Sequence, residues 1–118
     1  MGSTKENRGN PLEAVIKKAC TDYLDILENQ GKLYYIRNNS FAGTIVRGNG
    51  TRGFIKNNKK GTADVIVFPG HSRALWCEFK RPLASKQSPD QVKFEKLIKG
   101  LGYEYYIIRS LDDLIGVL

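Results

Sequence analysis

A long amphipathic helix is the first element that the pattern of apolar and polar residues predicts. Apolar residues recur at positions 12, 15, 16, 19, 20, 23, 24 and 27, and this spacing gathers them on one face of a helix. Asn10 and Pro11 are typical of a helix start, and Asn29-Gln30-Gly31 is typical of a helix end. Glu13 lies at the border of the apolar stripe, so it either caps the first turn or faces a cleft between the helix and a sheet.

Apolar and β-branched runs predict strands at 33–37, 65–68, 74–77 and 103–109. The runs at 65–68 and 74–77 are apolar at successive positions, as expected for central strands that are covered on both faces. The turn signal Pro69-Gly70 lies between them and predicts a β-hairpin. His71, in the same turn, is expected at the surface.

Two further helices are predicted after this hairpin. A polar linker at 81–87 is followed by Ser88, Pro89 and Gln91, which have the order of a cap, a first helical residue and a capping-box partner. Ser110 can cap a last helical turn. Because a strand, a helix and a strand follow one another here, the last strand should run parallel to its neighbour, beside an antiparallel hairpin. The sequence therefore predicts a flexible N-terminus at 1–9 and one α/β domain over 10–118, with a mixed β-sheet flanked by helices.

Positive charge is concentrated in one part of the chain. The net charge is +7, and the stretch between Glu28 and Asp64 contains no acidic residue. The basic residues of this stretch are Lys32, Arg37, Arg47, Arg52, Lys56, Lys59 and Lys60. Such a patch suits a polyanion such as nucleic acid, and it equally suits a solvated loop that keeps the protein dissolved.

Residues 38–60 are expected to form a long basic loop, with 44–46 and 54–55 as candidates for small strands. The glycines expected to interrupt regular structure are Gly43, Gly48, Gly50 and Gly53. Phe41 and Phe54 either stack on bases or anchor the loop to the core. The candidate DNA contacts, which would hold the phosphate backbone without reading sequence, are Arg47, Arg52, Lys56, Lys59 and Lys60.

The composition argues against membrane, secreted and zinc proteins. No apolar window approaches the roughly 20 residues of a membrane span, and the first ten residues lack the pattern of a signal peptide. Cys20 and Cys77 each fall in an apolar pattern, so we expect two buried reduced thiols. No CxxC motif or Cys/His cluster indicates zinc. The protein is therefore expected to be soluble and cytoplasmic, with no membrane partner.

Three charged residues stand where the hairpin strands should be apolar. Asp64 opens the first strand, and Glu78 and Lys80 close the second, so the hairpin brings the three together. Glu78 and Lys80 are two residues apart and leave the same face of the strand. Two carboxylates at one place repel each other unless a cation lies between them, and hard oxygen ligands favour Mg²⁺ or Mn²⁺. We therefore predict a metal-dependent nuclease site, and the alternative is a plain salt-bridge cluster across the strands.

The spacing of these residues resembles the PD-(D/E)xK nuclease signature, with 13 residues between Asp64 and Glu78-Phe79-Lys80. Ala63 stands where that superfamily usually has Pro. Three further features narrow the resemblance to one family. They are an acid early in the first helix, Gln87-Ser88-Pro89-Asp90-Gln91 after the linker, and Leu101-Gly102-Tyr103 before the last strand. This combination is similar to the VRR-NUC (virus-type replication-repair nuclease) family over about residues 11–118, in its stand-alone phage and bacterial form.

The resemblance implies a restriction-endonuclease-like core and a role for each motif residue. Asp64 and Glu78 would bind Mg²⁺ or Mn²⁺, together with the backbone carbonyl of Phe79. Glu13 would complete the ligand shell, directly or through water. Lys80 would orient or activate the attacking water and help to hold the phosphate.

Gln91 has two interpretations. The resemblance implies that it positions Lys80 or the water, whereas its place at a helix start implies a cap, and both roles are compatible.

The expected function is a structure-specific DNA endonuclease that acts on branched DNA such as Holliday junctions. Symmetric cutting of two strands favours a homodimer, with the tyrosine-rich segments 34–35 and 103–106 as candidate contacts or as core. The alternatives are an exonuclease, flap nuclease or restriction-type nuclease with the same site, a non-catalytic nucleic-acid-binding module, and an RNA-binding protein, although no RNP-like motif supports the last.

Overall fold

The computed structural model describes residues 10–38, 42–56, 59–82 and 86–118. The elements follow the order α1 (Asn10–Asn29), β1 (Tyr34–Arg37), β2 (Ala42–Val46), β3 (Arg52–Lys56), β4 (Val65–Gly70), β5 (Arg73–Phe79), α2 (Pro89–Gly100), β6 (Glu104–Ile108) and α3 (Leu111–Val117). The N-terminal segment expected to be flexible, 1–9, and the candidate stacking residue Phe41 lie outside the described residues.

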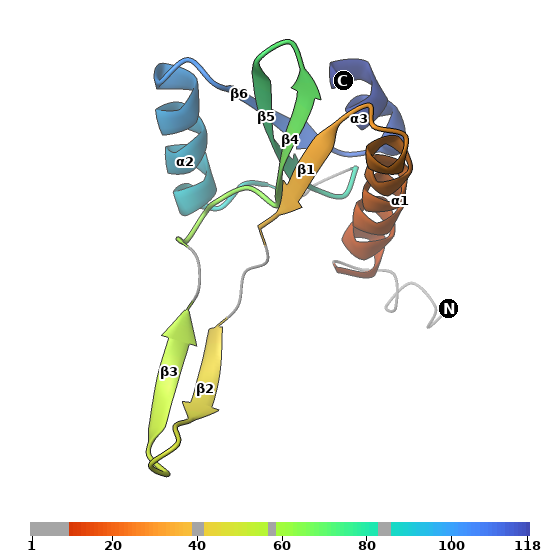
Figure 1. The fold of residues 1–118 in the computed structure, drawn as a ribbon. Coiled ribbons are helices and arrows are strands. Elements are labelled where there is room, and N and C mark those ends of the chain that lie inside the picture. Colours follow the sequence, from red (N-terminus) through yellow and green to blue (C-terminus); the bar gives the residue numbers. More distant parts are fainter. Residues whose placement is uncertain (1–9, 39–41, 57–58, 83–85) are drawn as a thin grey trace, which may run out of the picture.

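A four-stranded mixed sheet forms the centre of the protein, in the order β1-β4-β5-β6. β1 and β4 pair antiparallel, as do β4 and β5, whereas β5 and β6 run parallel. Because α2 connects the parallel strands, it crosses one face of the sheet, and α1 and α3 lie on the other side (Figure 1). The predicted α/β class and the mixed sheet flanked by helices are confirmed.

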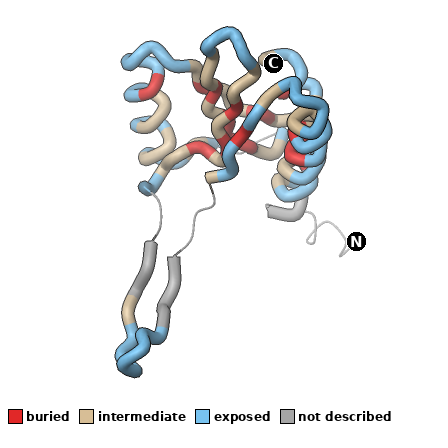
Figure 2. Tube along the Cα trace, in the orientation of Figure 1, coloured by how far each residue is buried: buried red, intermediate tan, exposed pale blue. Residues whose placement is uncertain are grey.

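The sheet buries a hydrophobic cluster on each face, as the continuous apolar runs of its central strands require. The cluster beneath α1 and α3 comprises Ile16, Cys20, Leu24, Tyr35, Val65, Val67, Leu75, Cys77, Phe79, Ile108 and Leu114. The smaller cluster beneath α2 comprises Ala63, Ile98 and Tyr105, with Trp76, Phe94 and Ile107 packed against it. Figure 2 shows the buried positions gathered along the sheet and the inner side of α1.

The expected thiols lie within the larger cluster. Cys20 and Cys77 are both buried and free, as predicted. Burial raises the pKa of the Cys20 thiol to about 11 and that of the Cys77 thiol to about 12. Both therefore stay protonated and unreactive at neutral pH.

Helix capping follows the local sequence. Ser88 accepts a hydrogen bond from the backbone N–H of Gln91, whose side chain accepts one from the Ser88 N–H, which completes the predicted capping box. Ser110 caps α3 through the N–H of Asp113. α1 ends at Asn29, and Gly31 follows with a φ of 72°, a conformation that favours glycine. The side chains of Asn10 and Pro11 lie outside the described residues.

The turn of the β4–β5 hairpin is shorter than the predicted turn, which began at Pro69 and included His71. Pro69 and Gly70 belong to β4, and the turn consists of His71 and Ser72, with φ values of 56° and 61°. Two successive left-handed residues match the right-handed twist of a hairpin. Pro69 has no N–H to donate to a ladder, and it falls where the register shifts between Val67 and Gly70. His71 is exposed, as expected for a surface turn.

The basic segment contains a second hairpin, so the expectation of a loop across 38–60 was wrong in part. β2 and β3 pair over 42–46 and 52–56, which confirms the two small strands and extends them. Gly43 and Gly53 lie inside these strands instead of interrupting them. At Gly53 the missing side chain leaves room for the guanidinium of Arg47, which donates to the carbonyl of Arg52. This hairpin extends away from the main sheet (Figure 1).

Some tyrosines serve the core and others lie at the surface. Tyr35 and Tyr105 are buried, whereas Tyr34 and Tyr103 are more than half exposed.

No helix among the described residues is long and apolar enough to span a membrane.

The segment before β4 is held closely against the start of α2. Gly61 has a φ of 83°, and a Cβ at this position would lie 2.5 Å from the backbone carbonyl of Asp90. The Nζ of Lys60 lies 3.3 Å from the carboxylate of Asp90. The positive φ and the lack of room for a Cβ both require glycine at position 61. This glycine therefore lets the segment that leads to Asp64 lie against the start of α2.

We expect Gly61→Ala to lower the free energy of unfolding by about 1–3 kcal/mol, because the new Cβ meets backbone and the left-handed φ becomes strained. Denaturant unfolding measures the change. Gly48→Ala is the control, since a Cβ there meets nothing within 4 Å. Equal stability of the two variants would contradict the close contact with Asp90.

Candidate active site

The hairpin brings Asp64 and Glu78 to the same end of the sheet. Val65 pairs with Cys77, so the preceding Asp64 lies across from the following Glu78. The N–H of Phe79 donates to Oδ2 of Asp64 at 2.8 Å, and the Asp64 carbonyl accepts from the N–H of Asn38 at 2.8 Å. These bonds hold Asp64 between the end of β5 and the end of β1.

Glu78 is a buried carboxyl group with incomplete hydrogen bonding. The residue is 4% exposed. Its Oε2 accepts from Nε2 of Gln91 at 2.7 Å and lies 4.0 Å from Nζ of Lys80. Its Oε1 is buried and has no hydrogen-bond partner among the described residues. A buried oxygen without a partner is costly unless a ligand supplies the missing interaction.

Burial raises the pKa of Glu78 from its ordinary 4.5 to about 8. The nearby carboxylates of Asp64 and Glu13 raise it further, while the ammonium groups of Lys80 and Lys17 lower it. Without a cation, the site therefore tends to keep a proton on Glu78. A divalent ion bound there would displace this proton, since carboxylates bind metals in their ionised form.

Helix α1 contributes two charged side chains to the site, the predicted Glu13 and Lys17, which was not predicted. Glu13 is close enough to raise the pKa of Glu78. Lys17, one helical turn later, places its Nζ 3.6 Å from Oδ1 of Asp64. Its spacing of four residues from Glu13 was the available signal, because residues i and i+4 share a helix face.

Gln91 forms the predicted helix cap, and its contact within the site is to Glu78, whereas the predicted contact was to Lys80 or a water molecule. Its Oε1 accepts from the N–H of Ser88 in the capping box, and its Nε2 donates to Glu78. The amide is thereby oriented by the start of α2, and it holds one oxygen of Glu78 in place. Lys80 is 12% exposed and continues the pairing of β5 with β6 through its N–H and the carbonyl of Ile108.

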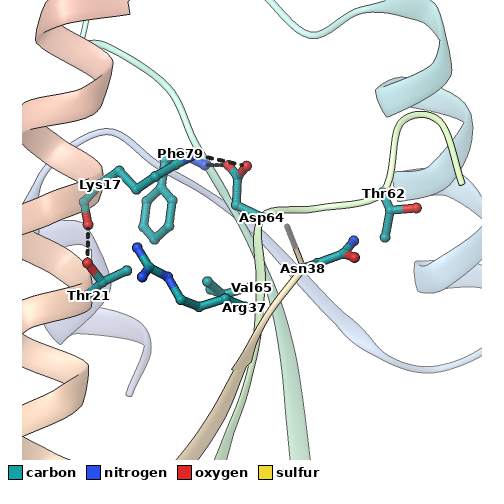
Figure 3. Close-up of a pocket in the computed structure, with 8 residues that line it drawn as sticks. All are labelled: Lys17, Thr21, Arg37, Asn38, Thr62, Asp64, Val65 and Phe79. Atoms are coloured by element: carbon teal, nitrogen blue, oxygen red, sulfur yellow. Dashed lines mark hydrogen bonds and ion pairs between the residues drawn. The ribbon is translucent and has the colours of Figure 1, made fainter. Parts of the chain in front are cut away.

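A polar cavity of about 200 Å³ adjoins this cluster (Figure 3). Its lining residues are Lys17, Thr21, Arg37, Asn38, Thr62, Asp64, Val65 and Phe79. Lys17, Thr21, Arg37, Asn38 and Thr62 were not among the predicted site residues. Arg37 is the last residue of the edge strand β1 and Asn38 follows it, and no local pattern indicates that this end meets Asp64.

The predicted DNA contacts divide between two places. Arg47 and Arg52 are exposed near the tip of the β2–β3 hairpin. Lys59 and Lys60 are exposed beside α2, where with Lys93, Phe94 and Leu97 they line a second hollow of about 300 Å³. Lys56 lies in β3, and its side chain is outside the described residues, as is that of Phe54.

The donor set suits a hard divalent cation. Asp64 and Glu78 supply carboxylate oxygens, and Oε1 of Glu78 lacks a hydrogen-bond partner within the described ranges of the chain. Within residues 10–38, 42–56, 59–82 and 86–118, no three His, Cys, Asp or Glu side chains gather closely enough to form a metal site by themselves. A bound ion would therefore use two carboxylates together with water or backbone oxygens, as Mg²⁺ commonly does.

Comparisons with known proteins assign no family to this arrangement. No protein-family model matches the chain, and no curated protein or solved structure matches it either. The chemistry of the site therefore rests on its own residues.

We expect the metal-free protein to lose stability as the pH rises from about 5 to 8. In this range the unfolded chain has released the Glu78 proton and the folded chain still holds it, so the unfolded state binds fewer protons. Glu78→Gln removes this dependence. At pH 8 the variant should be about 1–3 kcal/mol more stable, relative to wild type, than it is at pH 5.

Denaturant unfolding in EDTA at several pH values measures this difference. Asp112→Asn, which changes an exposed carboxylate on α3, should give a curve parallel to that of wild type. If the Glu78→Gln curve also ran parallel to wild type, the raised pKa of Glu78 would be wrong.

Proposed function

We propose that the protein is a Mg²⁺- or Mn²⁺-dependent DNA endonuclease. The observation that carries this proposal is the buried Glu78, set across from Asp64 and beside Lys80, with one oxygen that has no partner in the part of the chain that the structure describes. A purely structural salt bridge would not leave a buried carboxylate oxygen without a partner. The proposal includes membership of the VRR-NUC family and a restriction-endonuclease-like core, which the order of the motif residues along the chain supports.

Asp64 and Glu78 would hold the ion, and the backbone carbonyl of Phe79 is the predicted third ligand. Glu13 would act through water, since no three acidic side chains come together among the described residues. When bound, the ion would offset the negative charge of the phosphodiester and lower the pKa of a water molecule.

The remaining residues orient groups around the scissile phosphate. Lys80 presents a largely buried ammonium group next to Glu78, so it can hold the attacking water and balance charge in the transition state. Gln91 keeps the Glu78 carboxylate in one orientation through its hydrogen bond from α2. Lys80 and Glu78 remain adjacent because they are two positions apart in an extended segment, so their side chains leave the same face.

Branched DNA is the proposed substrate. The exposed basic residues occupy both the projecting hairpin, with Arg47 and Arg52, and the surface beside α2, with Lys59 and Lys60. Two separated basic surfaces suit a substrate whose helical arms diverge, because each arm presents its own phosphate backbone.

A panel of labelled substrates tests the activity: a four-way junction, a flap, linear duplex, single-stranded DNA and RNA, each with Mg²⁺ or EDTA. We expect paired nicks in the junction. Asp64→Asn and Glu78→Gln should each lower the rate roughly 10³-fold or more, because about 4 kcal/mol of charge stabilisation is lost.

Asp112→Asn is the matched control and should cut at the wild-type rate. Preferred cutting of flaps or linear ends would keep the site but replace the junction as substrate. Cutting that persists in EDTA, or equally in Asp64→Asn, would end the proposal.

A homodimer is part of the proposal, since symmetric cuts in a junction require two sites related by a twofold axis. β1 is an edge strand, and its Tyr34 and Ile36 are 59% and 47% exposed on one face. An edge strand with exposed apolar side chains is a ready pairing surface. Tyr35 points to the core and takes no part in it.

Sedimentation of the purified protein measures this association. Wild type should sediment as a dimer and Ile36→Glu as a folded monomer, because a charge opposes burial at an interface. Val46→Glu, on the β2–β3 hairpin, should remain dimeric. A monomeric wild type at all concentrations would rule out the dimer.

A further inference from the structure

The cavity beside Asp64 has one wall from α1 and another from the end of β1. Lys17 and Thr21 come from α1, and Arg37 is the last residue of β1. In Figure 3 the guanidinium of Arg37 extends toward α1, into the space between Thr21, Phe79 and Asp64. Two cationic side chains from separate elements therefore face one enclosed space.

These two cations differ in their present partners. Lys17 lies 3.6 Å from Asp64, a long contact for an ion pair, and its side chain is 41% exposed. The guanidinium of Arg37 donates no hydrogen bond and forms no ion pair within the part of the chain that the structure describes. A guanidinium carries five N–H donors in a planar fork, a shape that matches two oxygens of a phosphate.

The charge balance of the cavity favours an anion once the neighbouring carboxylates hold a cation. Asp64 is the acidic residue that lines the cavity, and its charge would then be committed to the ion. Among the residues that line this cavity, no other carboxylate would then balance the ammonium of Lys17 and the guanidinium of Arg37. A dianionic or monoanionic oxygen group would satisfy both.

We propose that Lys17 and Arg37 form a second phosphate-binding site, which holds the phosphate adjacent to the scissile one on the same DNA strand. This inference rests on the proposed function and specifies how the substrate strand enters that site. Asp64 lines the cavity and also faces Glu78, so a phosphate held there lies next to the phosphate at the reacting centre. Lys17 exchanges its contact with Asp64 for the phosphate when the cation binds.

The neighbouring hollows set the path of the strand. The next hollow along α1 is lined by Lys17, Lys18 and Arg37 together with Asp22 and Asp25, so it is less positive than the hollow beside α2, where three lysines face the single carboxylate of Asp90. On the other side, Thr62 lines both this cavity and the hollow that holds Lys59, Lys60 and Lys93. The strand therefore runs from Lys17 and Arg37 across Asp64 toward α2, where the positive charge is larger.

The test measures binding and cutting of the substrate that wild type cleaves best in the panel. Binding is measured with Ca²⁺ in place of Mg²⁺, over a range of salt concentrations. Lys17→Met and Arg37→Met should each weaken binding by ~5–20-fold. Each should also reduce the slope of log Kd against log[salt] by about 0.7–0.9, the loss expected for one phosphate contact.

Two further variants separate a phosphate contact from a general effect of charge. Arg37→Lys keeps the positive charge but loses the planar set of N–H donors. Its affinity for DNA should therefore lie between those of wild type and Arg37→Met. Lys32→Met removes an exposed positive charge outside the three hollows and should leave both Kd and slope unchanged within twofold. Thermal unfolding confirms that each variant folds.

The outcomes are distinguishable. An Arg37→Met protein that folds and keeps the wild-type Kd, salt slope and KM would overturn the second site while leaving the nuclease proposal intact. Wild type that binds DNA with the expected loss of slope in both variants, but cuts no substrate, would support the second site and overturn the nuclease proposal. An absence of any DNA binding would overturn both.

Discussion

The constraint on which the site depends is a carboxyl group that the fold buries without satisfying. Glu78 is in β5, which lies between β4 and β6 in the sheet, and its side chain reaches the start of α2. One of its carboxylate oxygens has no hydrogen-bond partner among the described residues. Burial and the neighbouring Asp64 disfavour its ionised form. The fold tolerates this cost because Gln91 and Lys80 stabilise the other oxygen. Without a cation, the missing hydrogen bond and the disfavoured charge of Glu78 destabilise this arrangement. This is the physical reason to interpret it as a site rather than as packing.

The elements converge on Glu78 through ordinary packing. The parallel connection between β5 and β6 places α2 on one face, so the N-terminal turn of α2 with Gln91 reaches Glu78. The antiparallel pairing of β4 with β5 sets Asp64 across from it. The apolar stripe of α1 packs on the opposite face, which leaves Lys17 at the border of the stripe to meet Asp64. Four elements or the residues next to them therefore contribute one or two polar side chains each, and apolar residues of the same elements belong to the two hydrophobic clusters.

Prediction from sequence succeeded where a local interaction decides the conformation. The capping box at Ser88 and the cap at Ser110 form as expected, because their hydrogen bonds close within three residues. It failed where a distant or side-chain contact prevails over a local preference. Pro69-Gly70 is a strong turn signal, yet the pairing of Gly70 with Arg73 extends the strands and confines the turn to His71 and Ser72. Gly53 reads as a breaker, but cross-strand pairing with Ile45 keeps it in a strand.

The sequence by itself determined the α/β class, the mixed sheet, the helix boundaries within a few residues, and the acidic and basic positions around Glu78. These follow from periodicity and spacing, which act over a few residues. Only the tertiary structure decided that Lys17 and Arg37 meet Asp64, that Gln91 bonds Glu78, and that one carboxylate oxygen is left without a partner. Those contacts join residues separated by 13 to 47 positions in the chain, and their distances depend on how the helices pack on the sheet. No pattern along the chain specifies that packing, because it is the sum of many weak contacts between all the elements.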